Sequence, residues 1–181
     1  MEQSDVYKLV LHPDPRLKKK LTEEVHWITD EHKAIAEKML RTMYQSKGVG
    51  LSTPQVGLEI RLIVLDDGTG PLVMFNPFVT NKLPKTKGGL EGCLSFPKLY
   101  KHVKRYETIA VRYRGLDNVV REEQFSGLQA RIILHEIDHL NGMTFIDHLS
   151  FASRLKLKPT LLKLKRQWKK IDESKLKPDV M

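Results

Sequence analysis

Apolar residues recur at helical spacing in two segments of the chain. The first helix is predicted to follow a cap at Thr29 or Asp30 and to end near Ser46, with an apolar face of Ile35, Met39, Leu40 and Met43. The second is predicted to begin at Ser126 and to stop at the Asn-Gly pair 141–142, with core-facing Leu128, Ile132 and Ile133. Both helices would therefore present one apolar face to a core.

Four short apolar runs predict strands, at 60–65, 72–75, 108–113 and 119–125. The last two would form a hairpin, because the intervening Gly-Leu-Asp-Asn favours a turn. Strands that are segregated from helices, and do not alternate with them, predict an α+β fold. We expect antiparallel β-sheets around a central helix, the one that begins at Ser126, with a further helix at the C-terminus.

Length and composition are typical of a single folded domain. The chain has 181 residues, 40% of them hydrophobic, which is enough to bury a real core. It has no apolar run of about 18 residues, and its first residues include neither a basic nor an apolar segment, so we expect no membrane span and no secretion signal. Cys93 is the only cysteine and cannot form an internal disulfide. These features predict a cytoplasmic protein.

Basic residues are concentrated near the C-terminus. The net charge is +9, and residues 151–181 contain ten basic and three acidic residues, so +7 of that charge lies there. A helix is predicted over about 159–171, since proline is tolerated in a first turn. We therefore divide the chain into a body, 1–150, and a basic C-terminal helix and tail, 151–181. The charge suggests an anionic partner such as nucleic acid, or only a solvated helix face.

The sequence HEIDH, His135 to His139, lies near the end of the second predicted helix. Positions i and i+4 share a helix face, so both imidazoles can reach one metal ion, with Glu136 beside them to handle a proton. The alternative is a polar helix end with two hydrogen-bonded histidines. Catalytic sites of this type usually have three protein ligands and one open position, so a third ligand is needed.

No downstream residue fits as the third ligand. One class of HExxH enzyme needs histidine at position 145, where this chain has Phe145, and another needs a downstream glutamate, for which only Glu173 in the basic tail is available. Cys93 is the natural candidate, although a lone cysteine is often a small buried hydrophobe. A thiolate with two neutral imidazoles leaves a fourth position open and is compatible with Zn or Fe(II).

Three motifs occur in one order along the chain. They are GVGLSTPQ at 48–55, EGCLS at 91–95 and HEIDH at 135–139. In these motifs and their order the sequence resembles the peptide deformylases, and the similarity covers roughly residues 8–150. This resemblance implies hydrolysis of the N-formyl group from the N-terminal formyl-methionine of nascent polypeptides, with release of formate.

The resemblance also implies a ligand set and a metal. Cys93, His135 and His139 would hold one divalent metal ion per chain. Fe(II) is the expected ion, and the same ligands accept Zn, Ni or Co.

Catalytic roles follow from the same resemblance. Glu136 would take a proton from water at the metal and deliver one to the departing amine, while the Gln55 side chain and the Leu94 backbone N–H would stabilise the oxyanion. The chain departs from the usual pattern at 52–53, where Ser-Thr replaces two alanines, and at Leu134, where many members have glutamine. We expect neither departure to contact a metal ligand or Gln55, so that they concern the shape and polarity of the pocket and not the chemistry.

Substrate-binding residues are suggested by their place near the motifs. Gly50 has no side chain, so a substrate backbone could approach it and pair as a strand would. Val49, Leu128 and Ile132 are candidates for the walls of a pocket for the methionine side chain. Ordinary core packing explains each of the three equally well.

The basic tail leaves two further interpretations open. By resemblance, the C-terminal helix would dock on ribosomal RNA through Lys163, Lys165, Arg166, Lys169 and Lys170, with Leu161, Leu162 and Leu164 holding it to the body. Alternatively, the protein is an RNA- or ribosome-binding module with a degenerate metal site.

A second enzymatic interpretation is an HExxH peptidase that cuts internal peptide bonds. The missing downstream ligand disfavours it.

Overall fold

The computed structural model describes the backbone of residues 5–176 and the side chains of residues 5–166. Within this part of the chain the helices are α1 (Asp30–Gln45), α2 (Gly127–Leu140) and α3 (Phe151–Leu176). The strands are β1 (Gly50–Ser52), β2 (Leu62–Leu65), β3 (Leu72–Lys82), β4 (Thr86–Cys93), β5 (Phe96–Tyr106), β6 (Thr108–Arg114) and β7 (Val120–Ser126).

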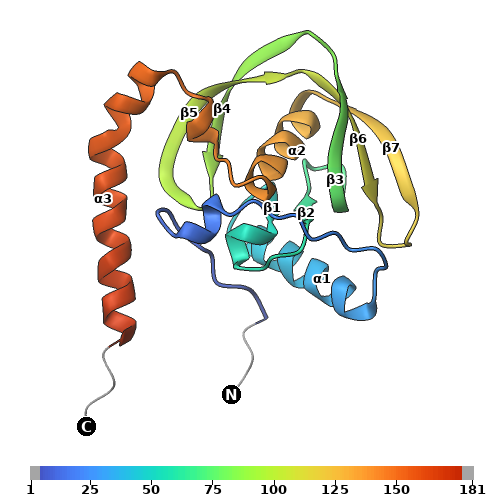
Figure 1. Ribbon diagram of the computed structural model, residues 1–181, viewed down its shortest axis with the longest axis horizontal. Helices are drawn as coiled ribbons and strands as arrows, with labels where there is room; N and C mark the ends of the chain where they lie inside the picture. The colour runs from blue at the N-terminus through green and yellow to red at the C-terminus, as the bar shows by residue number, and fades with distance from the viewer. Residues whose placement is uncertain (1–4, 177–181) are drawn as a thin grey trace.

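The strands form two antiparallel sheets. The larger has the order β1-β2-β3-β6-β7, and the smaller consists of β4 and β5. α2 lies between the two sheets and α3 stands at one side of the molecule (Figure 1). The predicted α+β fold, with antiparallel sheets around a central helix and a helix at the C-terminus, is confirmed.

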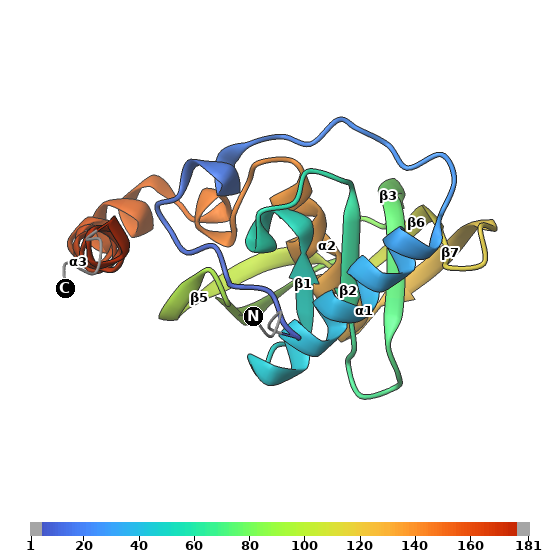
Figure 2. The same ribbon diagram turned by 90° about the horizontal axis from the view of Figure 1, so that it is seen from below.

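Strand β2 shows how the sequence builds two cores on one sheet. Successive side chains of a strand point to opposite faces. Ile63 and Leu65 belong to the core that contains α2, whereas Leu62 and Val64 belong to the core that contains α1. All four side chains are buried, so the sheet is covered on both faces, with α1 on the outer side (Figure 2). This arrangement explains why the strand is apolar throughout and does not alternate.

Several predicted elements are confirmed. α1 begins after a capping box at Thr29, whose side chain accepts a hydrogen bond from the backbone of His32. The β6–β7 hairpin and the start of α2 after Ser126 also agree with the sequence. β3 runs further than predicted, to Lys82, because a bulge near Asn76 lets the strand continue past a proline.

The hairpin of β4 and β5 was not predicted. Its first strand contains a glycine pair, 88–89, and its second has a bulge near its start, so neither shows a clean alternation. The buried side chains of β5 are Phe96, Leu99, Val103 and Arg105. Because the spacing between these residues is irregular, they do not show the period of two by which a strand is recognised.

The predicted start of the C-terminal helix, near Pro159, was wrong. α3 begins at Phe151 because Ser150 caps it, its Oγ accepting a hydrogen bond from the Ser153 N–H at 3.3 Å. Pro159 lies inside the helix. Leu157, Leu161 and Leu164 pack on a third core with Phe96 and Phe145. Leu162, which was expected to join this contact, is exposed instead.

Among the described residues, no helix combines the length and the apolar character needed to cross a bilayer.

Candidate active site

One face of α2 and the end of β4 bring together three side chains that could bind a metal ion. His135 and His139 are one helical turn apart, and Cys93 is the last residue of β4. Ligand atoms of these three residues lie within 4.8 Å of one another, and Cys93 Sγ is 3.3 Å from His139 Nε2. Cys93 lies 42 and 46 positions before the two histidines in the sequence, and the hairpin and the central helix make them adjacent.

The residues present fit a metal ion. Nitrogen and sulfur ligands about 2.0–2.3 Å from a tetrahedral ion lie roughly 3.3–3.8 Å apart, close to the separations found here. Burial lowers the pKa of His139 well below its usual value, which leaves its ring neutral, as a metal ligand must be. Burial would also lower the pKa of His135, but Cys93 and Glu91 raise it well above its usual value. The local field therefore favours a positive charge at this point.

Glu91 is the centre of a buried ion-pair network behind the cluster. Its carboxylate accepts two hydrogen bonds from Arg105, both at 3.0 Å, and one from Arg131 at 2.7 Å. It also lies 3.0 Å from His135 Nδ1. Burial alone would raise the pKa of Glu91, but His135 and Arg105 lower it to about 2. The carboxylate is thus ionised and accepts a hydrogen bond from Nδ1–H of His135, which leaves Nε2 of His135 to face the cluster.

The network extends from Arg105 to Asp138 and His148. Arg105 Nη1 donates to Asp138, and the same carboxylate oxygen lies 2.6 Å from His148 Nε2. Arg105 is buried, with 5% of its surface exposed.

Glu136 lies beside the metal-binding cluster. It is buried, and its Oε2 has no hydrogen-bond partner among the described residues. Burial raises its pKa to about 7, despite the opposing effects of His135 and Ser52. A carboxyl group with such a pKa can both accept and donate a proton near neutral pH. Gly50 faces it so closely that a Cβ there would come within 2.6 Å of Oε1.

Ser52 fixes the orientation of the Gln55 amide. The backbone N–H and the hydroxyl of Ser52 both donate to Gln55 Oε1, each at 2.8 Å. The Gln55 Nε2 is thereby turned toward Cys93 Sγ, at 3.4 Å. Thr53, the neighbouring departure from the usual family pattern, donates instead to the Ile60 carbonyl at 2.5 Å. The expectation that neither departure contacts Gln55 was therefore wrong for Ser52, whose hydroxyl adds a polar contact at the site itself.

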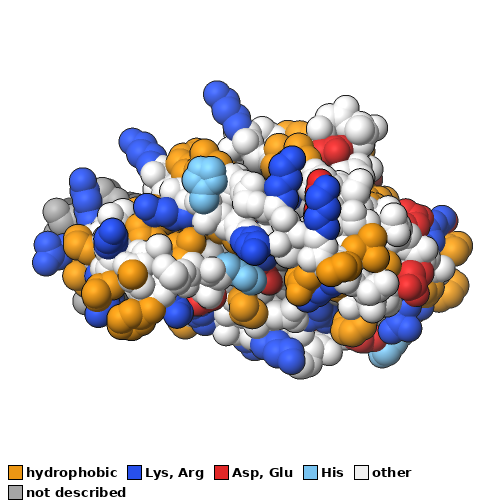
Figure 3. Space-filling view, turned by 90° about the horizontal axis from the view of Figure 1, so that it is seen from above, with side chains coloured by type: hydrophobic (Ala, Val, Ile, Leu, Met, Phe, Trp, Pro, Cys, Tyr) orange, Lys and Arg blue, Asp and Glu red, His pale blue; other side chains and the backbone are white. Residues whose placement is uncertain are grey.

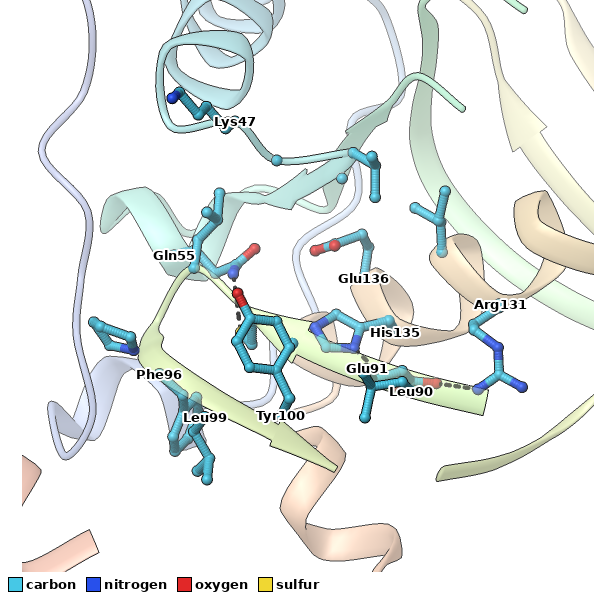
Figure 4. A pocket seen from close by; sticks show the side chains of 18 of the residues that line it. Lys47, Gln55, Leu90, Glu91, Phe96, Leu99, Tyr100, Arg131, His135 and Glu136 are labelled. Carbon is cyan, nitrogen blue, oxygen red and sulfur yellow. Dashed lines mark hydrogen bonds and ion pairs between the residues drawn. The ribbon is translucent and has the colours of Figure 1, made fainter. Parts of the chain in front are cut away.

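A cavity of about 420 Å³ opens beside these groups (Figure 4). Gln55, His135 and Glu136 line its buried end. The other predicted site residues on its wall are Val49, Gly50, Cys93, Leu94, Leu128 and Ile132. Val49 and Leu128 are exposed, and Ile132 also belongs to the α2 core.

Some residues of the site were missed by sequence reasoning. Glu91 stands two positions before Cys93, and a carboxylate so close to a ligand was a signal that could have been followed. Arg105 and Arg131 carried no such signal, because their partner lies 14 and 40 positions away. Ser52 was noted only as a departure. Tyr100 and Leu99, which also line the cavity, come from the unpredicted hairpin.

Fold and site together define a class of protein: a metal-dependent hydrolase with a Cys-His-His cluster and a glutamate at the end of a narrow cavity. Comparison with known proteins narrows this class. The family model described as polypeptide deformylase matches residues 6–155. A peptide deformylase of Afipia carboxidovorans is 42% identical over 154 residues, covering 82% of this chain and 90% of the relative.

Solved structures give the same result. The peptide deformylase of Thermotoga maritima is similar with a TM-score of 0.78 and 39% identity, over 80% of this chain and 98% of that chain. The enzyme from Plasmodium falciparum has a TM-score of 0.84 and 34% identity, over 90% and 97% of the two chains. The chain belongs to the polypeptide deformylase family, whose members hydrolyse the N-formyl group of nascent polypeptides. It is therefore a metal-dependent amide hydrolase.

Proposed function

We propose that Cys93, His135 and His139 hold one divalent ion at the buried end of the cavity, and that Glu136 carries the protons of the deformylation reaction. The observation that supports this is the position of Glu136. Its side chain lines the same cavity as Cys93 and His135, and its Oε2 has no hydrogen-bond partner among the described residues. When bound, such an ion supplies Lewis-acid chemistry, lowering the pKa of water and polarising a carbonyl oxygen.

The protein's own groups supply the rest of the reaction. Glu136 accepts the proton of the attacking water and later delivers a proton to the nitrogen of the departing methionine, so that formate and a free amine result. Gln55 Nε2 and the Leu94 backbone N–H donate to the oxygen on which negative charge develops. Ser52 supports this role, since it holds the Gln55 amide with its nitrogen toward the cluster.

The peptide would enter as an added strand. β1 is an edge strand of the larger sheet, and β4 pairs with β5 alone among the described strands, so both have an open edge. Residues of both strands line the cavity. An extended peptide between them would place its backbone against Gly50 and its methionine side chain among Val49, Leu128 and Ile132.

For the metal we propose Fe(II). A thiolate and two imidazoles suit both Fe(II) and Zn, and the same ligands take Ni or Co. We also propose a cytoplasmic location, which supports this assignment because a reducing compartment keeps Cys93 in its thiol form. Iron and the thiolate both oxidise in air. Protein prepared without oxygen should therefore contain iron by elemental analysis and should deformylate faster than air-exposed protein. A zinc-loaded protein that works faster than the iron form would contradict the proposal.

The ligand assignment has its own test. Cys93→Ala should reduce metal content from one ion per chain to a small fraction, because two imidazoles alone bind weakly. Elemental analysis after dialysis measures this directly. Met143→Ala, which changes an exposed residue outside the cavity, is the matched control. Full metal retention by Cys93→Ala would remove Cys93 from the ligand set.

We further propose that residues 151–181 form a ribosome-docking unit separate from the catalytic body, 1–150. α3 lies at one side of the molecule (Figure 1), and basic side chains gather at that end (Figure 3). Lys163, Lys165 and Arg166 are exposed. Lys169 and Lys170, which were expected to contribute, lie outside the residues whose side chains are described. Phosphate contacts by such a helix would position it on ribosomal RNA.

Co-sedimentation with ribosomes tests the docking proposal. Changing Lys163, Lys165 and Arg166 to glutamate should abolish co-sedimentation at low salt, while a short formylated peptide is still hydrolysed. Wild-type binding should weaken with salt by a logarithmic slope of roughly 0.9 per phosphate contact. The control carries three equal charge changes on the body, at Lys8, Lys33 and Lys104. Unchanged co-sedimentation of the α3 variant would refute the proposal.

A further inference from the structure

The cavity of the active site opens between two turns that both carry lysine in a left-handed backbone conformation. Lys47, with φ 57°, lies between α1 and β1, and Lys98, with φ 61°, lies near the start of β5. Both line the cavity and both are exposed. Glycine or asparagine is usual at such angles, because a side chain makes them unfavourable. The turns need the conformation, but they do not need lysine.

Lys47 is held on one side of the mouth by the end of α1. Its N–H bonds to the Tyr44 carbonyl, and the N–H of Gly48 bonds to the Met43 carbonyl, each at 2.9 Å. This is a helix end that requires a left-handed residue. A Cβ on Gly48 would come within 2.8 Å of Leu94, so this turn packs directly on the β4–β5 turn.

Lys98 is held on the other side by the bulge in β5. Gly92 pairs with Tyr100, but the next residue, Cys93, pairs with Phe96. Residues 97–99 are therefore extra on β5, and such bulges redirect side chains. Leu99 is buried and Lys98 is exposed. Figure 4 shows Lys47 on one side of the cavity. Leu99 and Tyr100, which follow Lys98 in the chain, lie on the other side.

The charge at this mouth is unbalanced. Two carboxylates line the cavity, and both are buried, with Glu91 already paired to two arginines. Neither Lys47 nor Lys98 has an ion-pair partner within 4.0 Å among the described side chains. The remaining rim is apolar and exposed, formed by Val49, Leu90, Tyr100 and Leu128. A peptide leaving the cavity would thus meet apolar surface and two free cations.

We propose that Lys47 and Lys98 are specificity-determining residues that favour formylated peptides with acidic side chains directly after the methionine. This inference rests on the proposed function, in which the formyl group lies at the buried end of the cavity. Each residue of an extended peptide spans about 3.3–3.6 Å. The two residues after methionine therefore cross the mouth, where both lysine side chains can reach a carboxylate.

The test compares kcat/KM for three peptide amides: formyl-Met-Glu-Ser, formyl-Met-Gln-Ser and formyl-Met-Lys-Ser. The C-terminal amide removes any other carboxylate, and Gln matches Glu in shape. An exposed ion pair changes affinity about 1.4- to 5-fold, so the Glu peptide should exceed the Gln peptide about two- to fivefold at low salt, with the Lys peptide slowest. Near 1 M salt, where the screening length is about 3 Å, the ratio should approach one.

Substitutions separate a local effect from the overall positive charge. K47E and K98E should each reduce the Glu-to-Gln ratio to one or below. K33E changes the net charge equally, but Lys33 lies near the start of α1, about 20 Å from Lys47 along the helix. The Glu-to-Gln ratio of K33E should therefore match that of the wild type. K47Q and K98Q, which should lower the ratio by less, replace any glutamate variant that does not fold.

A wild-type ratio of one at low salt would overturn the proposal, as would an equal loss in K33E. Hydrolysis of the Gln peptide at an ordinary rate in that case would leave the proposed function intact. Failure of the metal-loaded wild type to hydrolyse any of the three peptides would instead refute the proposed function and the selectivity with it.

Discussion

Replacing Glu91 with Gln should destabilise the protein by about 3 kcal/mol. The shift in the pKa of Glu91 from 4.5 to about 2 corresponds to roughly 3 kcal/mol at about 1.4 kcal/mol per unit. Removing one partner of a buried ion pair typically costs about 3–5 kcal/mol, which agrees. Glutamine keeps the shape, but it leaves Arg131 without its anion and Arg105 with Asp138 alone. Against a total stability of about 5–15 kcal/mol, such a loss is large.

Urea unfolding of the metal-free protein measures this cost without a contribution from metal binding. Because the folded-state pKa of Glu91 is depressed, its contribution should be complete above about pH 4.5 and lost as the pH falls toward about 2. The difference between wild type and E91Q should shrink over that window. Glu59→Gln, which alters an exposed pair with Lys19, is the control and should cost less than about 1 kcal/mol. A loss below about 1 kcal/mol in E91Q at neutral pH would refute the reasoning.

Three further substitutions have expected outcomes. Gln55→Ala should lower kcat about 10²–10³-fold with metal content unchanged, because it removes one donor to the oxyanion; kinetics with elemental analysis would show this, and normal kcat would exclude the role. Ser52→Ala should lower kcat only about two- to tenfold, since the backbone N–H still holds Gln55, and a larger change in KM than in kcat would contradict a positioning role. Leu157→Ala should cost about 2–5 kcal/mol in the contact of α3 with the body, giving faster hydrogen exchange throughout α3; unchanged exchange would show that Leu157 does not anchor the helix.

The elements that could be predicted from sequence are those with local signals. α1 has a cap at Thr29 and an apolar face at helical spacing, and α2 is bounded by Ser126 and an Asn-Gly pair. The β6–β7 hairpin has its own turn residues. In each case the residues that decide the structure lie within one turn of the element, so no tertiary information is needed.

The β4–β5 hairpin could not be predicted in this way. Its strands are held by the β4–β5 pairing and by packing on α3, and the bulge at 97–99 removes the period-two pattern. The motif around Cys93 indicated a candidate ligand, but the partners of Glu91 depend on how β5 and α2 pack. Arg105 shows the limit most clearly: an arginine in a basic stretch is normally solvated, and only the fold makes it buried and paired.

The central claim is that Glu136 moves the protons of deformylation at an ion held by the cysteine and the two histidines. The most direct measurement is formate release from formyl-Met-Ala-Ser by wild type and Glu136→Gln at equal metal content. The account predicts that E136Q retains one ion per chain and loses about 10²–10⁴-fold in rate. Near wild-type formate release by E136Q with its metal bound would contradict it.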